Sequence, residues 1–218
     1  MIIADLIKLM WEHVIMLSDL GKLIELIEEY YDRINQEWDS YYQGERFNLK
    51  RKQVVHVKEK MDILEMVLLY CSFINEKVME FVIKLGNNLN INLEVTSRVK
   101  QQNSIQYKID SYIQNHANGK IPIKKCLNDL FGIRIILNEN IEYNDIKQYM
   151  DESYSHLKCI DASKGDYVAV HIYFQNNNSN FPWELQIWCR SNEDNNIKSH
   201  KEYKQDYTKW ESENCGVK

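Results

Sequence analysis

Two acidic residues in segments that resemble β-strands are the first candidates for chemistry. In WELQIWCR, residues 183–190, strand alternation places Glu184 and Gln186 on one face and a set of core-type residues on the other. In DLFGIRIIL, Asp129 stands at the start of an apolar strand that also contains Arg134. Magnesium favours one or two carboxylates together with phosphate oxygens, so Asp129 and Glu184 are candidates for sharing one Mg2+ ion. The alternatives are a solvated sheet face for Glu184 and an ion pair between Asp129 and Arg134.

Cations and a hydroxyl group gather in RVKQQNSIQYK, residues 98–108. Arg98 and Lys100 come at the end of a predicted strand, and Ser104 and Lys108 are four residues apart on one face of the predicted helix that follows. A helix N-terminus flanked by cations is a natural site for phosphate. The alternative is ordinary solvated charge at the start of a helix, and the absence of a glycine-rich loop excludes a Walker-type phosphate loop.

A third candidate set lies in DYVAVHIYF, residues 166–174. Alternation puts Tyr167 and His171 on the face opposite the aliphatic residues. These two side chains offer an aromatic platform and an imidazole close to Glu184 if the two strands are neighbours. A histidine with a purely structural role is the alternative.

The elements that must position these residues change type along the chain. Residues 1 to about 86 have apolar residues at helical spacing, with a third helix expected from roughly residue 49 to residue 85. From residue 91 the pattern alternates between strands and helices, and five segments resemble strands: LEVTSRV, LFGIRIIL, LKCIDA, YVAVHIYF and PWELQIW. We therefore expect an α+β fold, a mixed β-sheet with covering helices, preceded by a long N-terminal helical region. The expected division is 1–90 for that region and 91–218 for the sheet domain.

Bulk composition narrows the class of protein. The chain has 218 residues, of which 44% are hydrophobic and 27% charged, so a real core is available, and the net charge of −5 gives no global attraction to nucleic acid or membrane. Five cysteines without a C-x-x-C pair indicate reduced thiols and a cytoplasmic location. Charged residues interrupt the apolar N-terminal run at helical intervals, so we expect neither a leader peptide nor a membrane span.

The order of these motifs resembles one known family. RVKQQNSIQYK, NDLFGIRII, DYVAVH, WELQIW and SHKEYK follow one another as do the motifs of the RelA/SpoT-type pyrophosphokinase domain, and the resemblance covers about residues 91–210. It implies a nucleotidyltransferase-like fold and transfer of pyrophosphate from ATP to a ribose 3′-oxygen, with Mg2+ as the cofactor. Such chemistry needs in-line positioning and charge neutralisation more than covalent catalysis.

The resemblance also implies a role for each candidate residue. Arg98 and Arg134 would flank the adenine of ATP, and three residues would hold its phosphates: Lys100, Ser104 and Lys108. Asp129 and Glu184 would bind magnesium, and Glu184 would also take the proton of the acceptor hydroxyl. On the acceptor side, Tyr167 would stack on the base, His171 would contact a phosphate, and Gln186 would be a third residue in contact with the acceptor.

Departures from the family pattern concern the acceptor side. Ala169 replaces a usual serine, and Trp188 and Cys189 replace the usual arginine and threonine. The QIW variant and the tail SHKEYKQDYTKW resemble the toxic small alarmone synthetases more than the housekeeping enzymes of the family. The first hypothesis is therefore a toxin that modifies the 3′ CCA end of tRNA, and the second is a synthetase of guanosine or adenosine alarmones from free nucleotides. A nucleotide sensor without catalysis is the third, and the presence of both acids argues against it.

Local charge and the N-terminal helices bear on partners. One basic run contains Lys50, Arg51 and Lys52 as possible tRNA contacts, and a second contains Lys120, Lys124 and Lys125. A solvated helix face is the alternative for both runs. The N-terminal helices are expected to cover the sheet, to form oligomers or to bind an antitoxin protein.

Overall fold

The protein is built around one five-stranded mixed sheet. In this computed structural model, which describes residues 2–88 and 94–202, the strand order is β1-β2-β5-β4-β3. The strands are β1 (Glu94–Val99), β2 (Phe131–Leu137), β3 (Lys158–Asp161), β4 (Val170–Phe174) and β5 (Trp183–Cys189). β2 and β5 are parallel, and the other three pairings are antiparallel. The mixed sheet expected from the sequence is confirmed.

The register of the strands separates an apolar face from a polar face. β2 and β5 pair with Gly132 opposite Glu184 and Arg134 opposite Gln186, whereas β5 and β4 pair with Glu184 opposite Tyr173. Side chains at these positions point to the same side of the sheet because neighbouring strands share the pleat. The alternate positions, such as Ile133, are buried in the main core.

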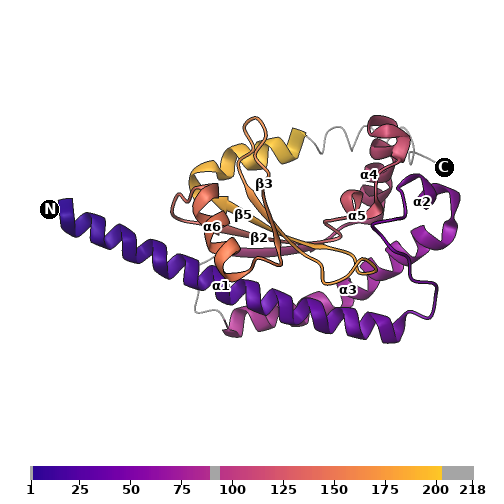
Figure 1. Cartoon of the computed structure of the whole chain (residues 1–218), viewed down its shortest axis with the longest axis horizontal. Helices are drawn as coiled ribbons and strands as arrows, with labels where there is room; N and C mark the ends of the chain where they lie inside the picture. Colours follow the sequence, from indigo (N-terminus) through magenta and orange to yellow (C-terminus); the bar gives the residue numbers. More distant parts are fainter. Residues whose placement is uncertain (1, 89–93, 203–218) are drawn as a thin grey trace.

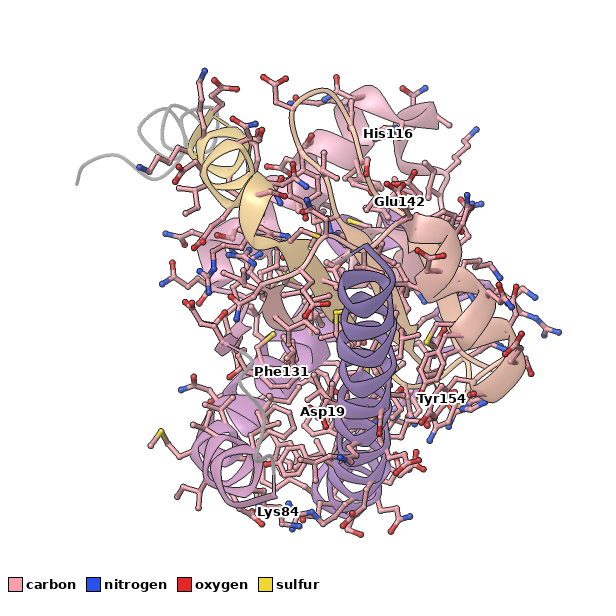
Figure 2. All side chains as sticks on the ribbon, turned by 90° about the vertical axis from the view of Figure 1, so that its left-hand side faces the viewer. Asp19, Lys84, His116, Phe131, Glu142 and Tyr154 are labelled. Carbon is pink, nitrogen blue, oxygen red and sulfur yellow. The ribbon has the colours of Figure 1, made fainter. Side chains whose placement is uncertain are left out.

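Three helices cover the apolar face: α1 (Ile2–Tyr41), α3 (Met61–Asn88) and α6 (Tyr143–Ser153). α1 and α3 run along one side of the sheet, and helical residues 193–202 lie on the other side (Figure 1). Among the described residues, three ion pairs join α1 to α3: Arg33 with Glu80 at 2.7 Å, Lys77 with Glu37 at 2.8 Å and Lys84 with Glu29 at 3.8 Å. Figure 2 shows Phe131 of β2 on one side of α1 and Tyr154, at the end of α6, on the other.

The remaining elements lie between α1 and α3, between β1 and β2, and directly after β5 in the chain. They are α2 (Val55–Glu59), α4 (Gln102–Asn115), η1 (Ala117–Gly119), α5 (Ile123–Cys126) and η2 (Arg190–Asn192). α4 joins β1 to the short α5, which leads into β2. Helices are therefore present where the sequence predicts them, α4 between β1 and β2 and α6 between β2 and β3.

The expected helix from about residue 49 was wrong at its start, because α3 begins only at Met61. The Oδ1 atom of Asn48 accepts hydrogen bonds from the backbone N–H groups of Lys50 and Arg51 and forms a local turn. Residues 49–54 then pair through their backbone with residues 121–124. Tertiary hydrogen bonds thus replace the helix that the apolar spacing predicts.

Two other boundaries differ from the sequence reading. β4 starts at Val170, whereas the predicted strand started at Tyr167, since Lys164 and Tyr167 close a turn in which Gly165 has φ +58°. The predicted closing helix is present at residues 193–202, and its expected continuation to Trp210 lies outside the described residues.

The N-terminal helices and the sheet share one hydrophobic core. Leu23 and Ile34 of α1 belong to the same buried cluster as Phe131 of β2 and Trp183 of β5. The division into residues 1–90 and 91–218 stays a prediction. Among the described residues, no helix combines the length and the apolarity that crossing a bilayer requires.

Candidate active site

Glu184 occupies the centre of the polar face and is almost fully buried, with 5% of its surface exposed. Its Oε1 atom accepts a hydrogen bond from the hydroxyl of Tyr173 at 2.9 Å and lies 3.0 Å from Nδ1 of His171. Its Oε2 atom accepts from the amide of Gln186 at 2.7 Å. Burial acts to raise the pKa of Glu184, but the hydrogen bond and charge of His171 outweigh it, so the pKa is lowered. Glu184 is therefore ionised at neutral pH.

A chain of polar contacts leads from His171 to Trp188. Nδ1 of His171 faces Oε1 of Glu184 at 3.0 Å, and its Nε2 lies 2.9 Å from the hydroxyl of Tyr167. The indole N–H of Trp188 donates to the oxygen of Tyr167 at 3.3 Å. The structure therefore brings Tyr167, His171, Gln186 and Glu184 together, as the sequence predicts.

A second cluster surrounds Asp129, which precedes β2. Lys100 Nζ lies 2.6 Å from Oδ2 and Lys108 Nζ lies 2.9 Å from Oδ1, and Lys108 also donates to Asn128 at 3.1 Å. Burial raises the pKa of the Asp129 carboxyl, but the two lysine charges lower it far below its usual range. An ion pair between Asp129 and Arg134 was the alternative interpretation. It was wrong, because both oxygens of Asp129 are held by lysines.

The two acids lie at the same end of the sheet. Asp129 stands just before the first residue of β2, and Glu184 is the second residue of β5, which runs parallel to β2. The negative charge of Asp129 is one of the influences on the pKa of Glu184, after burial and His171. The two carboxylates therefore interact electrostatically at the end of the sheet where β2 and β5 begin.

Burial lowers the pKa of both lysines around Asp129, but their net pKa shifts are opposite. Burial lowers the pKa of Lys100, and the attraction of Asp129 only partly offsets it. For Lys108 the attraction of Asp129 exceeds the effect of burial, and its pKa is raised. Both ammonium groups carry three donors, so each can hold Asp129 and still bind a further acceptor.

Ser104 lies on α4, one turn before Lys108, and is partly exposed. No side chain caps the N-terminus of α4, where Gln101 has an extended backbone. The backbone N–H groups of the first turn therefore have no partner within the helix. Lys108 and Ser104 share one face of α4, as the sequence predicts, and their role in binding phosphate stays a prediction.

Arg98 and Arg134 lie on the polar face around Gly132. Arg98 is exposed and pairs in register with Gly132, whereas Arg134 is half-buried and follows Gly132 by two residues. Burial lowers the pKa of Arg134, and the positive charge of Arg98 lowers it further. An ideal Cβ atom at Gly132 would meet only the side chain of Arg98, at 4.0 Å. Gly132 therefore leaves an open floor in the register position between Arg98 and Glu184, with Arg134 two residues further along β2.

Three of the side chains that support this face had no assigned role in the sequence analysis. Tyr173 binds Glu184, Trp188 lies under Arg134, and Asn128 binds Lys108. For Tyr173 the strand alternation gave the face but not the partner. His200, the first residue of the expected H-x-x-Y-K motif, lies 3.3 Å from Arg134 through Nε2. Tyr203 and Lys204 of that motif lie outside the described residues.

The basic runs predicted as tRNA contacts lie side by side. Ile123 N–H donates to Lys52 at 2.9 Å, and Lys124 N–H donates to Leu49 at 3.1 Å, both to backbone oxygens. Lys50 and Arg51 are exposed, while Lys52 is half-buried with Nζ 5.5 Å from the centre of the Phe47 ring.

Comparisons with known proteins point to one family. A family profile described as a region found in RelA / SpoT proteins matches residues 97–208, just over half of the chain. No curated protein matches the chain.

Solved structures with a similar fold include two small alarmone synthetases from Bacillus subtilis. Synthetase 2 has 17% identity and a TM-score of 0.39, over 65% of this chain and 79% of that one. Synthetase 1 has 20% identity and a TM-score of 0.38, over 66% and 77%. A GTP pyrophosphokinase family protein from Streptococcus pneumoniae has 18% identity and a TM-score of 0.38, over 68% and 76%.

Proposed function

The chain belongs to the RelA/SpoT family and is a pyrophosphokinase acting on nucleotides, and from that premise we propose its donor, metal and acceptor. The donor is ATP, and the acceptor is the 3′-hydroxyl of the CCA end of tRNA. The acceptor oxygen attacks the β-phosphorus of ATP, the bond between the α- and β-phosphates breaks, and AMP leaves. A tRNA with a blocked 3′ end cannot be aminoacylated, so the protein acts as a cytoplasmic toxin that an antitoxin protein neutralises.

The position of Glu184 is the observation that carries this proposal. An ionised carboxylate with 5% exposure is costly unless it is bound, and here three side chains orient it. The arrangement fits a general base for a hydroxyl group. The Asp129 cluster, with its two lysines, lies at the same edge of the sheet and fits the negative phosphates that must sit beside such a base.

The donor site follows from the residues around this edge. The adenine ring lies on the floor at Gly132 between Arg98 and Arg134, where a planar ring separates two like charges that otherwise repel. The phosphates extend toward Lys100 and Lys108 and the uncapped N-terminus of α4, with Ser104 in its first turn.

Magnesium fits the donor atoms that this edge provides. A carboxylate has about four acceptor positions; Asp129 uses two and Glu184 uses three in the hydrogen bonds described above. The described residues contain no group of three or more acidic, histidine or cysteine side chains that would hold a metal alone. Asp129 and Glu184 would therefore hold an ion that the nucleotide phosphates also bind. When bound, the ion neutralises charge on the transferred pyrophosphate.

Tyr167, His171 and Gln186 lie on the acceptor side of Glu184. The half-buried ring of Tyr167 gives the terminal base a surface to stack on, and His171 lies within reach of the adjoining phosphate. Gln186 links Glu184 to Arg134, since its amide donates to the carboxylate and its oxygen accepts two N–H groups of the guanidinium. The acceptor site and the donor site therefore share one hydrogen-bond network.

A basic surface supports tRNA as the acceptor; we define it as Lys50, Lys124, Lys125 and Lys158. Burial lowers the pKa of Lys124, and the charges of Lys50, Lys158 and Lys125 lower it further, so the four cations lie close together. Lys158 Nζ lies 5.7 Å from the centre of the Tyr173 ring, and the Tyr173 hydroxyl binds Glu184. The basic surface thus begins next to the proposed base, and a phosphate backbone bound there would deliver its end to Glu184.

An acceptor screen tests the proposal. The protein is incubated with magnesium, ATP labelled in its γ-phosphate, and either deacylated tRNA or free guanosine and adenosine nucleotides. We expect label on the 3′ end of tRNA. Label in free nucleotides alone would replace the first proposal by the second, an alarmone synthetase that uses the same donor site.

Charge reversal separates the basic surface from the catalytic residues. We expect Lys50→Glu/Lys125→Glu, which changes two exposed residues, to reduce transfer to tRNA at least tenfold and to flatten its salt dependence. Transfer to a free nucleotide should not change. The control Lys22→Glu/Lys147→Glu carries the same charge change on α1 and α6. Equal loss in both double variants would exclude a specific role for the basic surface.

A further inference from the structure

Arg134 belongs to a cluster of three side chains that contact one another on the polar face, the others being Trp188 and His200. Its guanidinium carbon lies 3.7 Å from the centre of the Trp188 ring, which is a close cation–π contact. On Trp188, His200 stacks with ring centres 5.5 Å apart and planes inclined by 28°. Trp188 is 1% exposed, so it cannot contact a ligand itself.

Two further sets of hydrogen bonds hold His200 and Trp188 in this cluster. The buried side chain of Asn196 accepts from the backbone N–H of Val168 and donates to its carbonyl, each at 2.8 Å, which ties helical residues 193–202 to the segment beside Tyr167. His200 follows Asn196 by four residues, so it lies on the same face of that helix. The indole N–H of Trp188 is fixed by Tyr167 at 3.3 Å.

The contacts of Arg134 fix the plane of its guanidinium. Two N–H groups donate to Oε1 of Gln186 at 3.1 and 3.0 Å, and one donates toward Nε2 of His200 at 3.3 Å. One flat side faces Trp188. The side chain is still only half-buried. Arg134 follows Gly132 by two residues on the same face of β2, so its accessible part lies on the side of the sheet where the proposed adenine binds.

We infer that Trp188, supported by His200, is a positioning residue that holds Arg134 flat for the adenine ring of ATP. This inference rests on the proposed function. A free arginine side chain has several rotatable bonds and would have to be ordered when the ring binds, which weakens binding. A guanidinium already oriented by an aromatic ring and by Gln186 binds the ring without that ordering.

Two substitutions isolate the aromatic ring of Trp188. Trp188→Phe and Trp188→Leu both lose the N–H that binds Tyr167, and both keep apolar bulk, but only phenylalanine keeps a ring under Arg134. Calorimetric titration with magnesium and ATP should show a Kd about tenfold higher for Trp188→Leu than for Trp188→Phe. Inorganic tripolyphosphate, which has no ring, should bind the two variants and the natural protein equally.

The outcomes separate this inference from the proposed function. Equal ATP affinity in the two variants, with normal ATP binding by the natural protein, would overturn the inference alone. An equal loss of ATP and tripolyphosphate binding in Trp188→Leu would also overturn it, since that result indicates general damage to the site. Failure of the natural protein to bind ATP would overturn both. If Trp188→Leu does not fold, His200→Ala should weaken ATP binding about threefold without affecting tripolyphosphate, and unchanged ATP binding would contradict the inference.

Discussion

Asp129 holds its negative charge in a place that water barely reaches. Its side chain is 12% exposed, and the side chains of Lys100 and Lys108 are 11% and 15% exposed. The carboxylate is ionised because the two lysines lower its pKa in spite of burial. The unfolded chain binds a proton at Asp129 near pH 3.9, and the folded chain binds it only at lower pH. The ionised residue therefore stabilises the fold above about pH 4, and that contribution is lost as the pH falls further.

Replacement of Asp129 should expose this contribution. Asp129→Ala leaves two buried lysines without their counter-ion, so we expect the free energy of unfolding at pH 7 to fall by roughly 3–5 kcal/mol. The difference between the natural protein and the variant should shrink between pH 5 and pH 3. Urea unfolding followed by circular dichroism measures both effects. A difference that is constant over this pH range would show that the carboxylate charge does not stabilise the fold.

Residue type predicted the acids and cations of the site better than their partners. Glu184 and Asp129 stood out because acids in or beside apolar strands are costly unless they are paired or functional, and the structure places both at the same end of the sheet. The sequence did not predict that Asp129 binds lysines, or that Tyr173 binds Glu184. Such contacts depend on which strands are neighbours and in what register, and a single sequence does not contain that information.

At the scale of elements, β2 provides an open floor at Gly132. The strands beside it place Arg98 on one side and Glu184 on the other in the same register. The nearest atoms to an ideal Cβ at this position are 4.0 Å away, so a small side chain would fit without strain. It would, however, occupy the space assigned to the adenine ring.

Gly132→Val should therefore separate stability from nucleotide binding. Valine is favoured in strands, and replacement of a strand glycine stabilises by about 0.5–1 kcal/mol, so we expect no loss of thermal stability. The Kd for ATP should rise at least tenfold, and Gly132→Ala should show a smaller increase. Calorimetry and thermal unfolding measure the two quantities. Unchanged ATP affinity in Gly132→Val would move the adenine away from this floor.

Hydrophobic periodicity predicted most helices and strands, but it failed where hydrogen bonds to a distant segment determine the local structure. The central strands β2 and β5 follow from alternation and from continuous apolar runs, and α6 follows from helical spacing. Helical spacing did not predict the start of α3, because residues 49–54 form backbone hydrogen bonds with residues 121–124, which are far away in the chain. The same pairing brings the two basic runs together, and local sequence spacing could not predict that they are neighbours.

At the scale of the whole molecule, Trp183 joins the N-terminal helices to the active strand. Its indole N–H donates to the hydroxyl of Tyr70 on α3 at 3.0 Å, and its ring meets that of Tyr31 on α1 edge to face at 5.2 Å. Glu184 is the next residue, on the opposite face of β5. The helices therefore help to hold the strand that carries the proposed base.

Tyr70→Phe tests this connection. The substitution leaves the buried N–H of Trp183 without a partner, so we expect the free energy of unfolding to fall by about 1–3 kcal/mol. Far-UV circular dichroism and tryptophan fluorescence should follow one urea transition, since the helices and the sheet share a core. Tyr41→Phe, at a residue that is 60% exposed, should have little effect. Two separate transitions would show that the helices and the sheet fold independently.

The most direct measurement of the central claim compares the natural protein with Glu184→Gln. Both are incubated with magnesium, γ-labelled ATP and deacylated tRNA, and AMP release and label on tRNA are counted together. The natural protein should form AMP and labelled tRNA in equal amounts. Glu184→Gln should lose at least about a hundredfold in rate while its Kd for ATP changes only a few-fold, because glutamine keeps the shape but accepts no proton. Equal rates in the two proteins would contradict the account, since Glu184 would then not be the base.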